Sequence, residues 1–144
     1  MDSSFTLQAG TTGTATIQVS STDLATAIST DPEDKFPAVL ATSRLVALME
    51  IASARLLKPH LGPGQLSVGV SIDVSHTAAT PPETLVTATA TYTGREGKLF
   101  LFDVVAMDAG GQVGKAVHKR AIVDRERLES SAKRRLESQG TSLM

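Results

Sequence analysis

Three polar residues of this chain stand inside apolar patterns, where a solvated side chain is unexpected. Glu50 lies on the apolar side of a helical segment, Thr42 lies at the start of that segment, and His76 continues the apolar face of an alternating strand. Together they supply a hydroxyl, a carboxylate and an imidazole, the groups that acyl transfer requires. The positive N-terminal end of the helix near Thr42 would also polarise a thioester carbonyl.

Each of the three residues also has a simple structural interpretation. Thr42 is placed to act as the N-cap of the helix, because its hydroxyl can accept a hydrogen bond from a free backbone N–H. Glu50 can reach solvent from the rim of the core, and His76 can end a strand with its ring satisfied. The residue types alone leave these interpretations open beside the catalytic one.

Helix geometry limits how Thr42 and Glu50 could act together. In one regular helix the two residues lie ~12 Å apart along the axis, too far to contact the same carbonyl group. Either Thr42 lies in a bent segment before the helix, or a dimer interface brings the two residues together from different subunits. The sequence does not choose between these arrangements.

The segment Ala41–Leu57 is the element on which the rest of the fold depends. Its apolar residues recur at helical spacing, while Arg44 and Arg55 share one polar stripe. The strand Leu66–Ser75 alternates strictly, which predicts one apolar face continued by His76. That face comprises Val68, Val70, Ile72 and Val74.

The order of the remaining elements indicates the fold class. Turn signals at Gly94–Gly97 and Asp108–Gly111 separate the later strands. One helix before a meander of antiparallel strands predicts an α+β domain in which a curved sheet wraps around the helix, the hotdog arrangement. Because one helix cannot cover five strands, we expect a homodimer. The predicted strands are Thr11–Val19, Leu66–Ser75, Glu83–Thr93, Lys98–Met107 and Gln112–Val123, with a short helix or turn at Asp23–Ser29.

Composition excludes several classes of function. The net charge of −1 gives no attraction to nucleic acid or an anionic membrane, and the absence of cysteine excludes thiol catalysis. The three histidines lack metal-ligand spacing, so we expect neither a metal nor another cofactor. We predict one domain over residues 1–124, a charged helix or tail over residues 125–144, and a cytoplasmic location. His118 and Arg120 share a strand face, which by default is solvated.

Much of the chain, from about Phe36 to Val123, resembles the fluoroacetyl-CoA thioesterase group of hotdog proteins. The motif SHTAATPP, which ends at Pro82, carries most of this likeness, with FP at Phe36, LME at Glu50 and HKRAIV at Val123. The resemblance implies a dimeric enzyme that hydrolyses a short acyl-CoA. It places the family's catalytic threonine, glutamate and histidine on Thr42, Glu50 and His76. It also implies a supporting glycine at Gly69, a substrate-pocket arginine at Arg120 and a substrate contact at Phe36.

One position departs from the pattern of the fluoroacetyl-selective enzyme. That enzyme has a lid aromatic three residues before the phenylalanine that matches Phe36, and this chain has Glu33 there. The resemblance therefore implies thioesterase chemistry. We expect an acyl group other than fluoroacetyl at least as strongly as fluoroacetyl itself.

Other functions on the same fold remain as alternatives. The acyl group could be carried by a carrier protein instead of CoA, or the domain could bind acyl-CoA without hydrolysing it. Dehydration of a hydroxyacyl thioester is less well matched, because the SHTAATPP motif is not typical of it. A scaffold that docks a partner through the charged tail is the last alternative.

Overall fold

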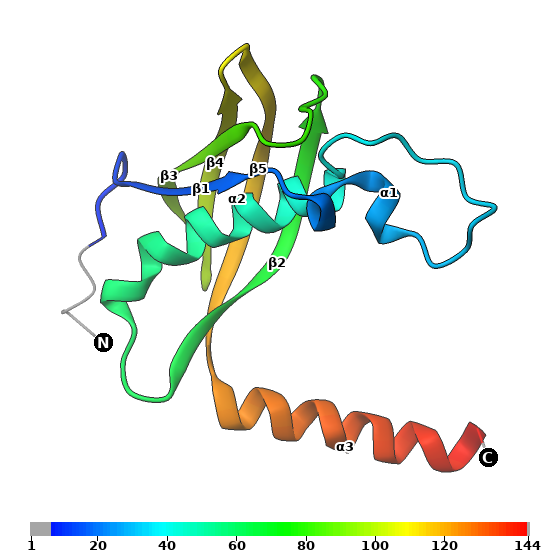
Figure 1. Cartoon of the computed structure of the whole chain (residues 1–144). Helices are drawn as coiled ribbons and strands as arrows, with labels where there is room; N and C mark the ends of the chain where they lie inside the picture. Colours follow the sequence, from blue (N-terminus) through cyan, green and yellow to red (C-terminus); the bar gives the residue numbers. More distant parts are fainter. Residues whose placement is uncertain (1–6, 144) are drawn as a thin grey trace.

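The computed structural model describes residues 7–143, which form one curved sheet, one central helix and one C-terminal helix (Figure 1). Strand β1 and the short helices η1 and α1 precede the central helix α2, and four long strands follow it. The elements are β1 (Thr12–Gln18), η1 (Ser21–Asp23), α1 (Ala25–Ile28), α2 (Thr42–Leu57), η2 (Lys58–His60), β2 (Gln65–His76), β3 (Leu85–Glu96), β4 (Leu99–Asp108), β5 (Gly111–Asp124) and α3 (Arg125–Leu143).

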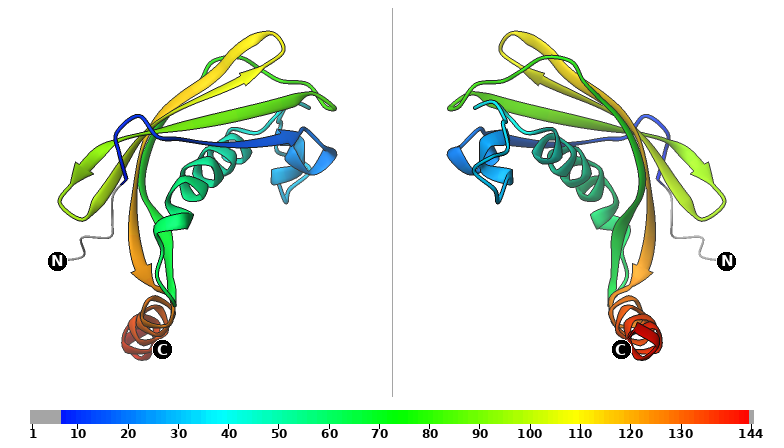
Figure 2. Two further views of the ribbon diagram at one scale, coloured as in Figure 1. Left: turned by 90° about the vertical axis from the view of Figure 1, so that its left-hand side faces the viewer. Right: turned by 90° about the vertical axis from the view of Figure 1, so that its right-hand side faces the viewer.

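The sheet is antiparallel throughout and has the strand order β1-β3-β4-β5-β2. It curls so that α2 lies along its concave side, while α3 follows the end of β5 and lies apart from α2 (Figure 2). The core fills the space between α2 and the sheet. Its fully buried side chains include Leu45, Leu48, Met49, Val86, Phe102 and Val104. The predicted wrapping of a sheet around the helix is confirmed.

The start of α2 differs from the sequence prediction. The residue in the N-cap position is Ala41, and Thr42 is the first residue of the helix. The interpretation of Thr42 as the N-cap is therefore wrong, and its hydroxyl is free to bond outside the helix. Arg44 and Arg55 are both exposed, which confirms the polar stripe.

Strand β2 contains a register shift between Gly69 and Ser71, so its side chains do not alternate as one regular pattern. Gly69 pairs with Arg120, and Ile72 pairs with His118. Position 69 before the shift and position 72 after it therefore lie on the same concave face, although a regular strand would place them on opposite faces. Val70 is the extra residue and its side chain is 53% exposed. The prediction that Val68, Val70, Ile72 and Val74 share one face is therefore wrong for Val68 and Val70, which precede the end of the shift.

Strand β5 differs from its default interpretation in the same region. His118 and Arg120 are 1% and 6% exposed, so both side chains point into the concave side instead of toward solvent. Lys115 and Lys119 have the opposite parity and lie on the outer face.

The turn between β3 and β4 is shorter than the predicted Gly94–Gly97. Strand β3 continues to Glu96, and Gly97 adopts a φ of 61°, in the left-handed region that favours glycine. Gly94 lies within the strand, where the pairing with β4 shifts after Tyr92. No helix within residues 7–143 is both long and apolar enough to cross a membrane.

Candidate active site

Thr42 and His76 meet at the N-terminal end of α2. A hydrogen bond of 2.8 Å joins the Thr42 hydroxyl to His76 Nδ1, linking the first residue of α2 to the last residue of β2. The other ring nitrogen, His76 Nε2, is buried and has no hydrogen-bond partner within residues 7–143. A buried nitrogen without a partner is rare in folded proteins, which marks this ring as a candidate for a functional role.

The start of α2 is held in place by Asp23, which is 5% exposed. Its carboxylate accepts hydrogen bonds from the Ser20 backbone N–H at 2.8 Å and from Arg44 Nε at 3.0 Å, and its backbone carbonyl accepts one from the N–H of Ala41 at 2.9 Å. Burial alone would raise the pKa of Asp23, but the hydrogen bonds from Ser20 and the charge of Arg44 outweigh it and lower that pKa. Asp23 therefore fixes the residue just before Thr42.

The segment between α1 and α2 is closed at its base. The Ala25 N–H donates to the carbonyl of Val39 at 2.8 Å, and Leu24 forms an isolated bridge with Leu40. Residues 26–38, which include most of α1, therefore form a loop whose two ends lie side by side, and Figure 1 shows this loop projecting beyond the end of α2.

An apolar hollow of about 460 Å³ lies between this loop and the Thr42–His76 pair. Ile28 and Phe36, each 47% exposed, are large apolar side chains in its wall. Other lining residues come from the segment that follows His76, among them Ala78 and Ala79. The hollow has the size of a small-molecule site and places apolar surface next to the hydroxyl and the imidazole.

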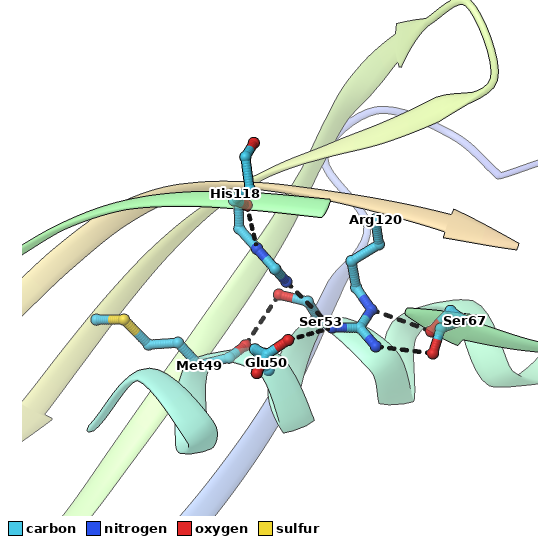
Figure 3. Close-up of polar contacts among 7 residues, drawn as sticks. Met49, Glu50, Ser53, Ser67, His118 and Arg120 are labelled. Carbon is cyan, nitrogen blue, oxygen red and sulfur yellow. Dashed lines mark hydrogen bonds and ion pairs between the residues drawn. The ribbon is translucent and has the colours of Figure 1, made fainter. Parts of the chain in front are cut away.

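Glu50 belongs to a second cluster, in which it faces Arg120 of β5 (Figure 3). Arg120 NH1 donates to Glu50 Oε1 at 3.2 Å, and the Glu50 side chain is 41% exposed while that of Arg120 is 7% exposed. The Glu50 carboxylate is therefore held by Arg120 and still reaches solvent. Gly69 of β2 lies against this carboxylate, so closely that a Cβ at position 69 would collide with Glu50 Oε1.

His118 completes this second cluster. Its Nδ1 lies 2.8 Å from the carbonyl oxygen of Ser71, and its Nε2 lies 3.1 Å from Arg120 NH1. Burial lowers the pKa of His118, and the positive charge of Arg120 lowers it further, against the opposing effects of the Ser71 carbonyl and Glu50.

The structure therefore brings the predicted site residues together in two sets. One set contains Thr42 and His76 beside the hollow, with Phe36 in its wall, and the other contains Glu50, Gly69 and Arg120. No hydrogen bond or ion pair between described residues of the chain joins the two sets. The same described range contains no group of three or more histidine, aspartate or glutamate side chains placed to hold a metal ion.

Sequence reasoning missed the inward position of His118 and the role of Asp23. The two lysines at 115 and 119 were a usable signal, because residues of their parity must face solvent and His118 must then face inward. For Asp23 the spacing Ser20-x-x-Asp23, typical of a capping box, was a usable local signal, whereas its ion pair with Arg44 of α2 has none.

Comparison with known proteins identifies the family of this chain. The model of the fluoroacetyl-CoA-specific thioesterase family, FlK, matches residues 19–126. A fluoroacetyl-CoA thioesterase from Streptantibioticus cattleyicolor is 40% identical over 101 residues, which cover 70% of this chain and 73% of that protein.

Solved structures extend the likeness to the whole fold. A mutant of the fluoroacetyl-CoA thioesterase FlK in complex with fluoroacetate is 34% identical, covers 90% of this chain and 98% of its own, and superposes with a TM-score of 0.85. A thioesterase superfamily member from Thermus thermophilus, at 21% identity, shares the fold with a TM-score of 0.83 over 96% of this chain and 98% of its own. The curved sheet around α2 is thus the hotdog fold, and the chain belongs to the fluoroacetyl-CoA-specific thioesterase family.

Proposed function

We propose that this protein is an acyl-CoA thioesterase that uses Thr42, Glu50 and His76 to hydrolyse the thioester bond. The observation that carries the proposal is the Thr42–His76 hydrogen bond, which lies at the N-terminus of α2 and beside an apolar hollow. The family relationship supports the same chemistry, because the matched relative is a fluoroacetyl-CoA thioesterase.

In this proposal the thioester carbonyl lies at the N-terminus of α2 and the acyl group lies in the hollow. The positive end of the helix stabilises the oxyanion that develops on the carbonyl oxygen. The Glu50 carboxylate acts either as nucleophile or as the base that activates water. His76, held by Thr42, gives a proton to the departing CoA thiolate.

We further propose that the active site is composite and that the protein works as a homodimer. Within the described part of one chain, Glu50 is paired with Arg120, and no hydrogen bond or ion pair joins it to Thr42 or His76. A two-fold dimer that lays the two helices across each other would bring Glu50 of one subunit to Thr42 and His76 of the other.

Three further residues have supporting parts in the proposal. Arg120 holds the Glu50 carboxylate, Gly69 leaves room for it, and Phe36 forms part of the acyl pocket. Glu33 is exposed in the loop, so the proposal does not require selectivity for fluoroacetyl. The cytoplasmic location and the absence of a membrane partner stay predictions.

The direct test is release of free CoA from a series of acyl-CoA esters, including acetyl, fluoroacetyl, malonyl, medium-chain and aromatic esters. We expect hydrolysis of at least one ester, with apolar acyl groups preferred over malonyl because the hollow presents apolar side chains. A protein that binds these esters and hydrolyses none of them would contradict the proposal. It would indicate a binding module or an acyl group carried by a protein.

The small size of Gly69 gives a second expectation. Gly69→Ala should lower kcat about 100-fold, because the added methyl group must displace the Glu50 carboxylate from its position on Arg120. A steady-state assay and a thermal melt would separate this loss from unfolding. Gly110→Ala is the matched control, since a Cβ there lies 3.3 Å from a side-chain oxygen of Asp108 in a surface turn.

A further inference from the structure

The Arg120 guanidinium is in contact with four acceptor atoms, of which only the imidazole nitrogen of His118 can also carry a proton. Its Nε and NH2 donate to Ser67 Oγ and to the Ser67 carbonyl, both at 3.0 Å. Its NH1 is directed at Glu50 Oε1 and, at 3.1 Å, at His118 Nε2 (Figure 3). The first three acceptors are a hydroxyl, a carbonyl and a carboxylate, and the fourth is an imidazole that can carry a proton.

The contacts of His118 determine which of its nitrogens is protonated. Arginine can only donate, so Nε2 must be the unprotonated acceptor of the bond from Arg120. The carbonyl of Ser71 can only accept, so Nδ1 must carry the hydrogen. Both contacts are satisfied only by the neutral ring with its proton on Nδ1.

The surroundings of His118 favour this neutral form. The ring is 1% exposed and packs near Phe102 of β4 at 6.2 Å between ring centroids. The charged groups that face it are Arg120 of its own strand and Glu50 of α2, and β2 contributes the uncharged Ser71 carbonyl. A second proton would place an N–H and a positive charge against NH1 of Arg120.

We propose that His118 is a positioning residue of the active site: through its neutral ring it holds NH1 of Arg120 on the Glu50 carboxylate. The register shift between Gly69 and Ser71 supports this arrangement, because it lies at the carbonyl that orients the ring and at the glycine that faces Glu50. This inference rests on the proposed function of Glu50 as the catalytic carboxylate.

The test compares two amide variants that differ by one methylene group. In His118→Gln the amide oxygen can reach the place of Nε2 and accept from Arg120. In His118→Asn the shorter amide reaches only the place of Nδ1. We expect His118→Asn to lower kcat roughly 10- to 100-fold with a smaller change in KM, and His118→Gln to restore most of that loss.

A double variant separates positioning from a general loss of stability. If His118 acts through Arg120, then His118→Asn should cause no further loss of kcat in an Arg120→Met background. Equal losses in both backgrounds, or an Asn variant as active as the wild type, would overturn the inference.

The protonation state has its own test, which does not depend on activity. In the nitrogen-15 spectrum of the wild-type imidazoles at pH 7, one neutral ring should carry its proton on Nδ1. The signal that disappears in His118→Gln assigns it. A protonated ring, or a proton on Nε2, would overturn the inference. If the wild type hydrolyses no acyl-CoA while the spectrum is as expected, the proposed function fails and the contact geometry stands.

Discussion

Replacing Glu50 by glutamine is expected to lower kcat for acyl-CoA hydrolysis by roughly 100- to 10,000-fold, because the amide can neither attack the thioester nor accept a proton from water. The folded structure should persist. The glutamine oxygen can still accept from NH1 of Arg120, and the side chain at this position is partly exposed.

The measurement is release of CoA under saturating substrate, with a thermal melt of the same preparation. Glu129→Gln in α3 is the matched control, because it makes the same chemical change on an exposed helix that is separate from α2 (Figure 1). A glutamine variant with wild-type kcat would remove Glu50 from the mechanism and leave the Thr42–His76 pair to be explained alone.

Co-expressing two inactive variants, so that their subunits pair, is expected to restore activity. In a dimer whose sites combine Glu50 of one subunit with His76 of the other, a heterodimer of Glu50→Gln and His76→Ala contains one intact site and one site that lacks both groups. Co-expression with random pairing should therefore recover roughly a quarter of the wild-type activity.

The alternative arrangement gives the opposite result. If Glu50 and His76 of the same chain serve one site, every site in the heterodimer lacks one of the two groups and no activity returns. Separately purified variants that are assayed together without exchange of subunits provide the baseline. This experiment also tests the predicted homodimer, since a monomer could not show complementation.

The helix and the succession of strands along the chain could be predicted because their signals are local and repeated. The segment that contains α2 has a helical apolar period, and the turns after β3 and β4 carry glycine, so the hotdog arrangement followed and is confirmed. The membership of the thioesterase family was likewise visible in the SHTAATPP motif and is confirmed by the match over residues 19–126.

The details of the site could not be predicted because they depend on contacts between distant segments. The extra residue Val70 shifts the pairing of β2 with β5; the neighbouring Gly69 is a residue type found at bulges, but the alternating sequence around it predicts a regular face. Thr42 has the residue type of an N-cap but bonds to His76, 34 positions away. The roles of Thr42, Glu50 and His76 in catalysis stay predictions until the variants are assayed.

The closed base of the loop over residues 26–38 bears on how this family could diversify. Because Ala25 is hydrogen-bonded to Val39 and Asp23 fixes the residue before Thr42, the backbone at the start of α2 is anchored independently of the loop tip. Under the proposed function, substitutions in this loop, for example at Phe36 in the wall of the hollow, would alter which acyl group is admitted while Thr42 and His76 stay in place. Selection on substrate range and selection on catalytic rate would then act on separate stretches of the gene.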